Sequence, residues 1–108
     1  MATEQLESCI RDCYECALAC DRCAGACLTE GQASQMADCI RLDIDCADAC
    51  RFAAAAMARG SGQMGTICGM CAQVCEACAQ ECEKHDPQHC KQCAAACRKC
   101  AESCKAMA

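Results

Sequence analysis

The chain has 108 residues, of which 19 are cysteines, and its formal net charge is −5 at pH 7. This length is enough for one domain, and an acidic chain without a basic cluster excludes nucleic acid and anionic membranes as expected partners. No apolar run approaches the roughly 20 residues of a membrane span, and the N-terminus lacks the apolar segment of a secretion signal. We therefore expect a cytoplasmic protein.

The first predicted helix covers about residues 3–30, and its cysteines follow α-helical spacing. Its six cysteines are separated by alternating steps of four and three residues. Leu or Ile occupies these positions in an ordinary helical bundle. At 1.5 Å per residue the six side chains form a stripe about 27 Å long on one face of the helix. The first helix therefore presents a face lined with sulfur.

The second predicted helix covers about residues 34–59 and carries a diluted copy of the pattern. Asp43 stands where the spacing calls for a further cysteine. A carboxylate is costly to bury, so we expect Asp43 either to accept hydrogen bonds or to help bind a metal. Ile44 and Phe52 lie off the cysteine face of this helix, where they either pack against neighbouring helices or contact another protomer.

The third and fourth predicted helices cover about residues 63–85 and 87–107, and each repeats the full cysteine spacing. Asp86 and Pro87 are expected as the N-cap and first residue of the fourth helix, because Asp caps helices and Pro tolerates the first turn. Charged residues between the cysteines, Asp12 among them, are expected on the solvent faces.

Four helices with short connections predict an all-α fold, namely an antiparallel up-down-up-down four-helix bundle over residues 1–108. Conventional core residues are scarce, with one Phe and no Trp. Cysteine itself buries well as a small hydrophobe. The sequence therefore predicts a single domain with a cysteine-lined core.

A disulfide scaffold is the usual interpretation of so many cysteines, and three features argue against it. The number of cysteines is odd, and the chain shows no secretion signal. Cysteines three or four residues apart on one helix also project nearly parallel, which disfavours the disulfide dihedral angle. We expect free thiols instead.

Charge distinguishes the metals that such a core could hold. Buried thiols stay protonated without metal, and a monovalent ion that replaces each proton leaves the interior neutral. A divalent ion bound by four thiolates leaves about two negative charges per site, which are costly to bury without compensating cations. Thiolate also selects Cu(I). Many Cu(I) ions per chain are therefore expected, with zinc or general soft-metal sequestration, a role like that of metallothionein, as the alternative.

The two ends of the bundle differ in their predicted ligands. Met36, His85 and His89 lie at one end, and Met57, Met64 and Met107 lie at the other. Methionine commonly fills gaps in a core, so the three-methionine end is expected to be an apolar plug. We expect the histidine end to be the entrance, because polar groups can be wetted and can pass ions inward. The uniform cysteines single out no nucleophile, so no enzymatic activity is expected.

The chain resembles the cytosolic bacterial copper storage proteins, which are cysteine-rich four-helix bundles. The resemblance is carried by CIRDCYECALACDRCAGAC, CIRLDIDCADAC, CGMCAQVCEACAQECEKHD and HCKQCAAACRKCAESC, which together cover most of the chain. It implies a homotetramer of bundles, each filled with thiolate-bound Cu(I) that is stored reversibly in the cytosol. Besides copper ions, cytosolic copper carriers are candidate partners.

The expected metal ligands combine every cysteine with four residues of other types. They are Cys9, Cys13, Cys16, Cys20, Cys23, Cys27, Cys39, Cys46, Cys50, Cys68, Cys71, Cys75, Cys78, Cys82, Cys90, Cys93, Cys97, Cys100, Cys104, His85, His89, Asp43 and Met36.

Overall fold

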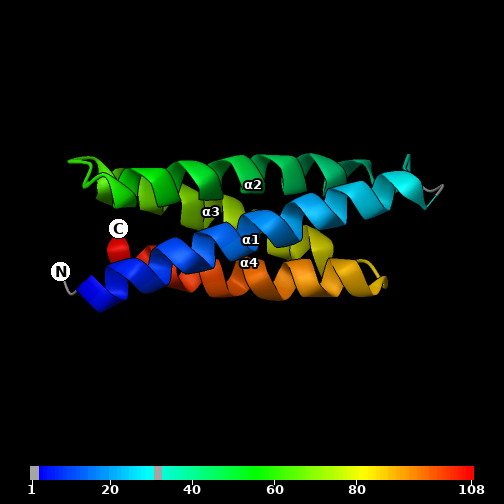
Figure 1. The fold of residues 1–108 in the computed structure, drawn as a ribbon. Coiled ribbons are helices and arrows are strands. Elements are labelled where there is room, and N and C mark those ends of the chain that lie inside the picture. The colour runs from blue at the N-terminus through cyan, green and yellow to red at the C-terminus, as the bar shows by residue number, and fades with distance from the viewer. Residues whose placement is uncertain (1–2, 31–32) are drawn as a thin grey trace.

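The computed structural model describes residues 3–30 and 33–108, which form four helices. These are α1 (Thr3–Thr29), α2 (Ala37–Ala58), α3 (Met64–Cys82) and α4 (Gln88–Met107). The helices run side by side and antiparallel along a body measuring 44 × 17 × 17 Å (Figure 1). Helices α1 and α3 each pack against both α2 and α4. The predicted all-α, up-down-up-down four-helix bundle is confirmed.

Two helix ends differ from the predicted bounds. Helix α2 begins at Ala37 rather than near residue 34, because residues 33–36 form turns in which the Met36 amide donates to the Ala33 carbonyl at 3.2 Å. Helix α3 ends at Cys82 rather than near residue 85, and turns follow at Glu83 and Lys84. Local turns replace the predicted helix at both places.

The start of α4 corrects the predicted roles of Asp86 and Pro87. Pro87 is the N-cap, with an extended ψ of 145°, and the helix begins at Gln88. The Pro87 carbonyl accepts hydrogen bonds from the amides of Cys90 at 3.0 Å and Lys91 at 3.2 Å. Asp86 therefore lies outside the helix and does not cap it. The proline N-cap offers no side-chain acceptor to the first amides of the helix.

The connection from α2 to α3 is a tight helix C-terminal turn built on Gly60. Gly60 has a φ of +68°, a left-handed conformation that glycine adopts without a Cβ penalty. The Gly60 amide donates to the Met57 carbonyl at 3.2 Å, and the Ser61 amide donates to the Ala56 carbonyl at 3.0 Å. This pair of bonds is a Schellman motif, which ends α2 and turns the chain back into α3.

The core of the bundle is made of sulfur and methyl groups. All 19 cysteines are buried free thiols, and alanines such as Ala47, Ala53 and Ala79 fill the remaining contacts between helices. The cysteine face of each helix therefore points to the bundle axis, as predicted, and the thiols are not joined in disulfides. Within the described residues, no helix combines the length and apolarity needed to cross a membrane.

Asp12 is a correction to the predicted solvent faces. Its side chain is 8% exposed and lies between α1 and α4, where Ser103 Oγ donates to Asp12 Oδ2 and Lys99 Nζ lies 3.4 Å from Oδ1. The spacing of charged residues could not reveal this, because the Ser103 and Lys99 partners come from the other end of the chain.

Candidate metal centre

The thiols of the core form a continuous row of contacts along the bundle, which we call the sulfur ladder. At one end Cys9 Sγ lies 3.9 Å from Cys104 Sγ, which lies 3.6 Å from Cys13 Sγ. Cys13 Sγ is in turn 3.6 Å from Cys100 Sγ. From there each thiol lies 3.6–3.8 Å from the next, in the order Cys100, Cys50, Cys75, Cys46, Cys97, Cys20 and Cys93.

Groups of four thiols lie along the ladder with all their sulfur atoms within 4.8 Å of one another. One group joins Cys13, Cys71, Cys100 and Cys104, so it takes thiols from three helices. Several groups share members. Four thiols each belong to two groups, namely Cys16, Cys20, Cys46 and Cys97. Shared thiols can bridge metal ions, so the arrangement favours a connected cluster over separate four-ligand sites.

Asp43 is fully buried in the ladder and is surrounded by thiols. The thiols of Cys78 and Cys93 donate to Asp43 Oδ1 at 3.3 Å, and that of Cys82 donates to it at 3.5 Å. The Cys39 thiol lies 3.8 Å from Oδ2. Burial raises the pKa of Asp43 from 3.8 to about 10, so the carboxyl group keeps its proton at neutral pH. Hydrogen bonding, one of the two predicted roles of Asp43, is thus present in the structure.

Burial favours the protonated form of thiols near both ends of the core in the metal-free protein. Burial raises the pKa of Cys27 to about 11, of Cys68 to about 11 and of Cys90 to about 12. Every Lys and Arg within the described residues is solvent-exposed, so no cation lies beside the sulfurs to stabilise a buried thiolate. A cation that enters the core must therefore replace the thiol protons.

Beyond the Cys93 end of the ladder, the four-thiol group of Cys23, Cys27, Cys39 and Cys90 meets a histidine that bridges the core and the surface. His89 Nδ1 lies 3.3 Å from Cys23 Sγ and 3.6 Å from Cys90 Sγ. On the other side of the ring, His89 Nε2 lies 3.0 Å from Glu30 Oε1. A neutral imidazole that donates from Nε2 to the carboxylate leaves Nδ1 as an acceptor facing the sulfurs. The structure thus brings His89 to the thiols, as the sequence predicted for this end.

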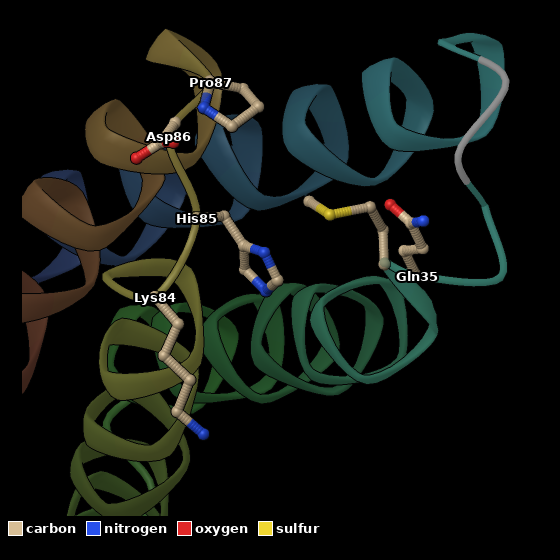
Figure 2. Close-up of a pocket in the computed structure, with 6 residues that line it drawn as sticks. Gln35, Lys84, His85, Asp86 and Pro87 are labelled. Carbon is tan, nitrogen blue, oxygen red and sulfur yellow. The ribbon is translucent and has the colours of Figure 1, made fainter.

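His85 lies at the same end but has a different partner. Its Nε2 atom is 2.9 Å from Glu81 Oε2, one turn earlier in α3. Together with Met36 it lines a pocket of about 620 Å³, whose other lining residues are Gln35, Lys84, Asp86 and Pro87 (Figure 2). The buried Met36 and the half-buried His85 therefore line the same surface pocket at this end of the bundle.

The opposite end of the bundle is closed by methionines. Met57 and Met107 are 1% and 3% exposed, and Met64 packs against the same core from the start of α3. Ala108 lies close to Gly65 and Gly69 of α3, since a Cβ atom added at either glycine would be 3.6 Å from an Ala108 atom. This packing agrees with the predicted apolar plug.

Two carboxylates that hold the histidines were missed by sequence reasoning. Glu81 stands four residues before His85 on one helix, a spacing that could have indicated the pair. Glu30 lies 59 residues before His89, so only the fold brings them together. The described structure thus adds a carboxylate to each predicted histidine ligand.

The comparisons with known proteins agree with this architecture. The family model for Csp, copper storage protein, matches residues 2–108. The Cu(I)-bound copper storage protein BsCsp3 is 48% identical, with a TM-score of 0.93 over 96% of this chain and 98% of that chain. Copper storage protein 3 from Bacillus subtilis, in its apo form, is 48% identical, with a TM-score of 0.89 over 94% of this chain and 96% of that chain.

Two further relatives come from Streptomyces and Bacillus. A cytosolic copper storage protein from Streptomyces lividans, with five coppers, is 41% identical, with a TM-score of 0.93 over 96% of this chain and 92% of that chain. The uncharacterized cysteine-rich protein YhjQ from Bacillus subtilis (strain 168) is 49% identical over 83 residues, which is 77% of each chain.

Proposed function

We propose that this chain, which belongs to the copper storage protein family, stores many Cu(I) ions in the thiol-lined core of its bundle. The observation that carries the proposal is the sulfur ladder, a continuous row of buried free thiols that are not joined in disulfides and, among the described residues, have no Lys or Arg buried beside them. Each entering Cu(I) releases one thiol proton, so the interior stays neutral as it fills. With bridging thiolates the capacity is on the order of twenty ions per chain.

The alternative, zinc sequestration, is less well supported by this geometry. A zinc ion takes four ligands, and four thiolates around it leave a buried double negative charge. The four-thiol groups share members, so they cannot all be filled as separate tetrahedral sites. Cu(I) needs two or three sulfurs per ion and adds no net charge, so it uses the shared thiols more completely.

The proposed ligands are the 19 cysteines, with Asp43 added inside the core and Met36, His85 and His89 added at the histidine end. Three thiols already contact the Asp43 carboxyl group, so a cation bound to them would favour its ionised form and bring it into the coordination sphere. His89 Nδ1 faces Cys23 and Cys90, which completes a set of one nitrogen and two sulfurs. We place the main entrance for copper here, beside the pocket of Met36 and His85.

The proposed role is storage in the cytoplasm, without catalytic turnover, with copper ions and cytosolic copper carriers as partners. The cytosolic Streptomyces lividans relative supports this location. Reduced thiols are also maintained in the cytosol, and storage in free thiols requires that environment.

The proposed assembly is a homotetramer, and the exposed apolar side chains indicate its contact face. Large hydrophobic side chains are exposed on α1 and α2, two helices that pack against each other. We call this set the apolar face; it consists of Tyr14, Leu18, Leu28, Ile44 and Phe52, each 47–59% exposed. Tyr14 and Leu18 stand one helical turn apart on α1, and large exposed hydrophobic side chains on neighbouring helices are typical of protein interfaces. This favours the second of the two explanations given for Ile44 and Phe52.

An anaerobic titration of the reduced protein tests the proposed function. Cu(I) is added against a competing chelator, and zinc is added in a parallel series. We expect Cu(I) to be retained until the bound ions approach the number of cysteines, on the order of twenty. Saturation at about four or five ions with either metal would instead indicate separate tetrahedral sites and would contradict copper storage.

A further inference from the structure

We propose that the core has a second, lateral opening for Cu(I) at Cys9, remote from the histidine end. This inference rests on the proposed storage function and adds a route by which ions exchange with the ladder. Cys9 is the first rung of the sulfur ladder, at the end of the bundle where both termini lie (Figure 1). It retains 1% of its surface, whereas the other 18 cysteines retain none.

A surface pocket on the side of the bundle has Cys9 among its lining residues. We call this pocket of about 310 Å³ the Cys9 hollow; it is lined by Gln5, Ser8 and Cys9 of α1 and by Glu102, Ser103 and Ala106 of α4. The small side chains of Ser8, Ser103 and Ala106 leave the groove between the two helices unfilled. The hollow is therefore a lateral approach to Cys9 that does not pass through the methionine plug.

The hollow ends where α1 and α4 are joined by a half-buried polar contact. Ser103 Oγ donates to the Asp12 carboxylate one turn farther along α1, and Lys99 lies 3.4 Å from the same group. This contact holds α1 and α4 together beyond Cys9. The hollow is therefore confined to the C-terminal end of α4 and the facing residues of α1. The axial route beside it is filled by the buried Met57 and Met107. At this end of the described structure, Cys9 is therefore the most accessible ladder thiol.

The contacts behind Cys9 allow an ion to move inward by ligand exchange. Cys104 Sγ lies 3.9 Å from Cys9 Sγ, and Cys13 Sγ lies 3.6 Å from Cys104 Sγ. An ion carried by two small thiolates would exchange one of them for Cys9. The Cys9–S–Cu bond forms, one carrier S–Cu bond breaks, and the departing carrier thiolate takes the proton from Cys9. Copper stays Cu(I) throughout, so no oxidant or reductant is needed.

The first test maps which thiol a small reagent reaches first. The reduced, metal-free protein is treated with iodoacetamide under nitrogen, and peptide masses give the rate of labelling at each cysteine. We expect Cys9 to be labelled about tenfold faster than Cys13 and Cys104, because those two require a larger local opening. Equal rates for the three would mean that the whole end opens together, and would overturn the proposal.

The second test fills the hollow without changing a cysteine. Ala106→Phe places a ring in the hollow from α4, and Ser8→Phe does so from α1; both positions are solvent-exposed. Ala95→Phe, an exposed position on α4 outside the hollow, is the matched control. We expect each filling variant to slow Cys9 labelling, with Cys90 labelling and total capacity unchanged. In a His89→Ala background, which weakens the main entrance, each should also slow Cu(I) uptake from a Cu(I)–glutathione complex.

The two proposals fail in different ways. If Cys9 is labelled at the wild-type rate in both Ala106→Phe and Ser8→Phe while capacity stays high, the lateral opening is wrong and storage stands. If the wild-type protein binds only a few ions, storage itself is wrong. Because the two variants fill the hollow from different helices, a folding defect in one leaves the other as a test.

Discussion

His89 and Cys23 are joined at the mouth of the core, with Nδ1 and Sγ 3.3 Å apart, although they stand 66 residues apart in the chain. The contact places the imidazole ring between the Glu30 carboxylate and the first buried thiols, with one ring nitrogen facing each. Because Glu30 occupies Nε2, the ring is held with Nδ1 toward the sulfurs. An ion that arrives from solvent therefore meets a ligand that is already oriented.

Replacing His89 should slow loading without emptying the store. We expect His89→Ala to reduce the initial rate of Cu(I) uptake several-fold, because the first nitrogen ligand is lost, while the ladder thiols keep the total capacity nearly unchanged. Stopped-flow absorbance of the Cu(I)–thiolate bands measures the rate. Glu30→Gln, which loosens the ring but keeps it, should have a smaller effect in the same direction. An unchanged initial rate in His89→Ala would argue against this entrance.

Asp43 should make the stability of the metal-free protein depend on pH. Its pKa is about 10 in the folded protein and 3.8 as an ordinary value, so between these pH values the folded state holds a proton that the unfolded state has released. The contribution of Asp43 is fully present below pH 3.8 and is lost as the pH rises toward 10, with a slope of up to about 1.4 kcal/mol per pH unit.

Denaturant unfolding of the reduced apo protein between pH 5 and 8 tests this dependence. In that range the thiols of the unfolded chain are still mostly protonated, so Asp43 dominates the slope. We expect Asp43→Asn to flatten the fall in unfolding free energy, and the exposed Asp45→Asn to leave it unchanged. Parallel pH curves for the wild type and Asp43→Asn would show that the buried carboxyl group is not protonated as inferred.

The apolar face should control assembly. If the protein forms the proposed tetramer through this face, we expect Leu18→Lys and Phe52→Lys, singly or together, to shift it toward smaller species, because lysine cannot be buried there unpaired. Light scattering after size-exclusion chromatography gives the mass of each species. Gln92→Lys, an exposed change on α4, serves as the control. A tetramer that survives the double change would place the interface elsewhere.

Gly60 should be the glycine whose replacement costs the most in the α2–α3 turn. Its φ of +68° is strained for any residue with a Cβ atom, although a Cβ there would meet nothing within 4 Å. We expect Gly60→Ala to lower the free energy of unfolding by about 1 kcal/mol. Gly62→Ala, which also has open space and no positive φ, should change it by less. Equal effects would mean that the backbone conformation of Gly60 is not what ends α2.

The cysteine spacing was enough to predict the bundle, because steps of three and four residues place the thiols on one face of each helix and short connections leave few topologies. It also predicted that Asp43 would lie among thiols. The spacing could not predict contacts between helices far apart in sequence. The pairing of His89 with Glu30, the burial of Asp12 against Ser103 and the hollow at Cys9 all depend on how α1 lies against α4. The predicted start of α4 was wrong because Pro87 takes an extended ψ, which the sequence alone did not determine.

The number of protons released for each Cu(I) bound tests the central claim most directly. In weakly buffered anaerobic solution near pH 7, thiols raised in pKa by burial, such as Cys68 and Cys27, hold their protons until copper arrives. The account predicts about one proton released per Cu(I), constant until most of the cysteines are used. Release of about two protons per ion, or of none, would show that single positive charges do not replace thiol protons in this core.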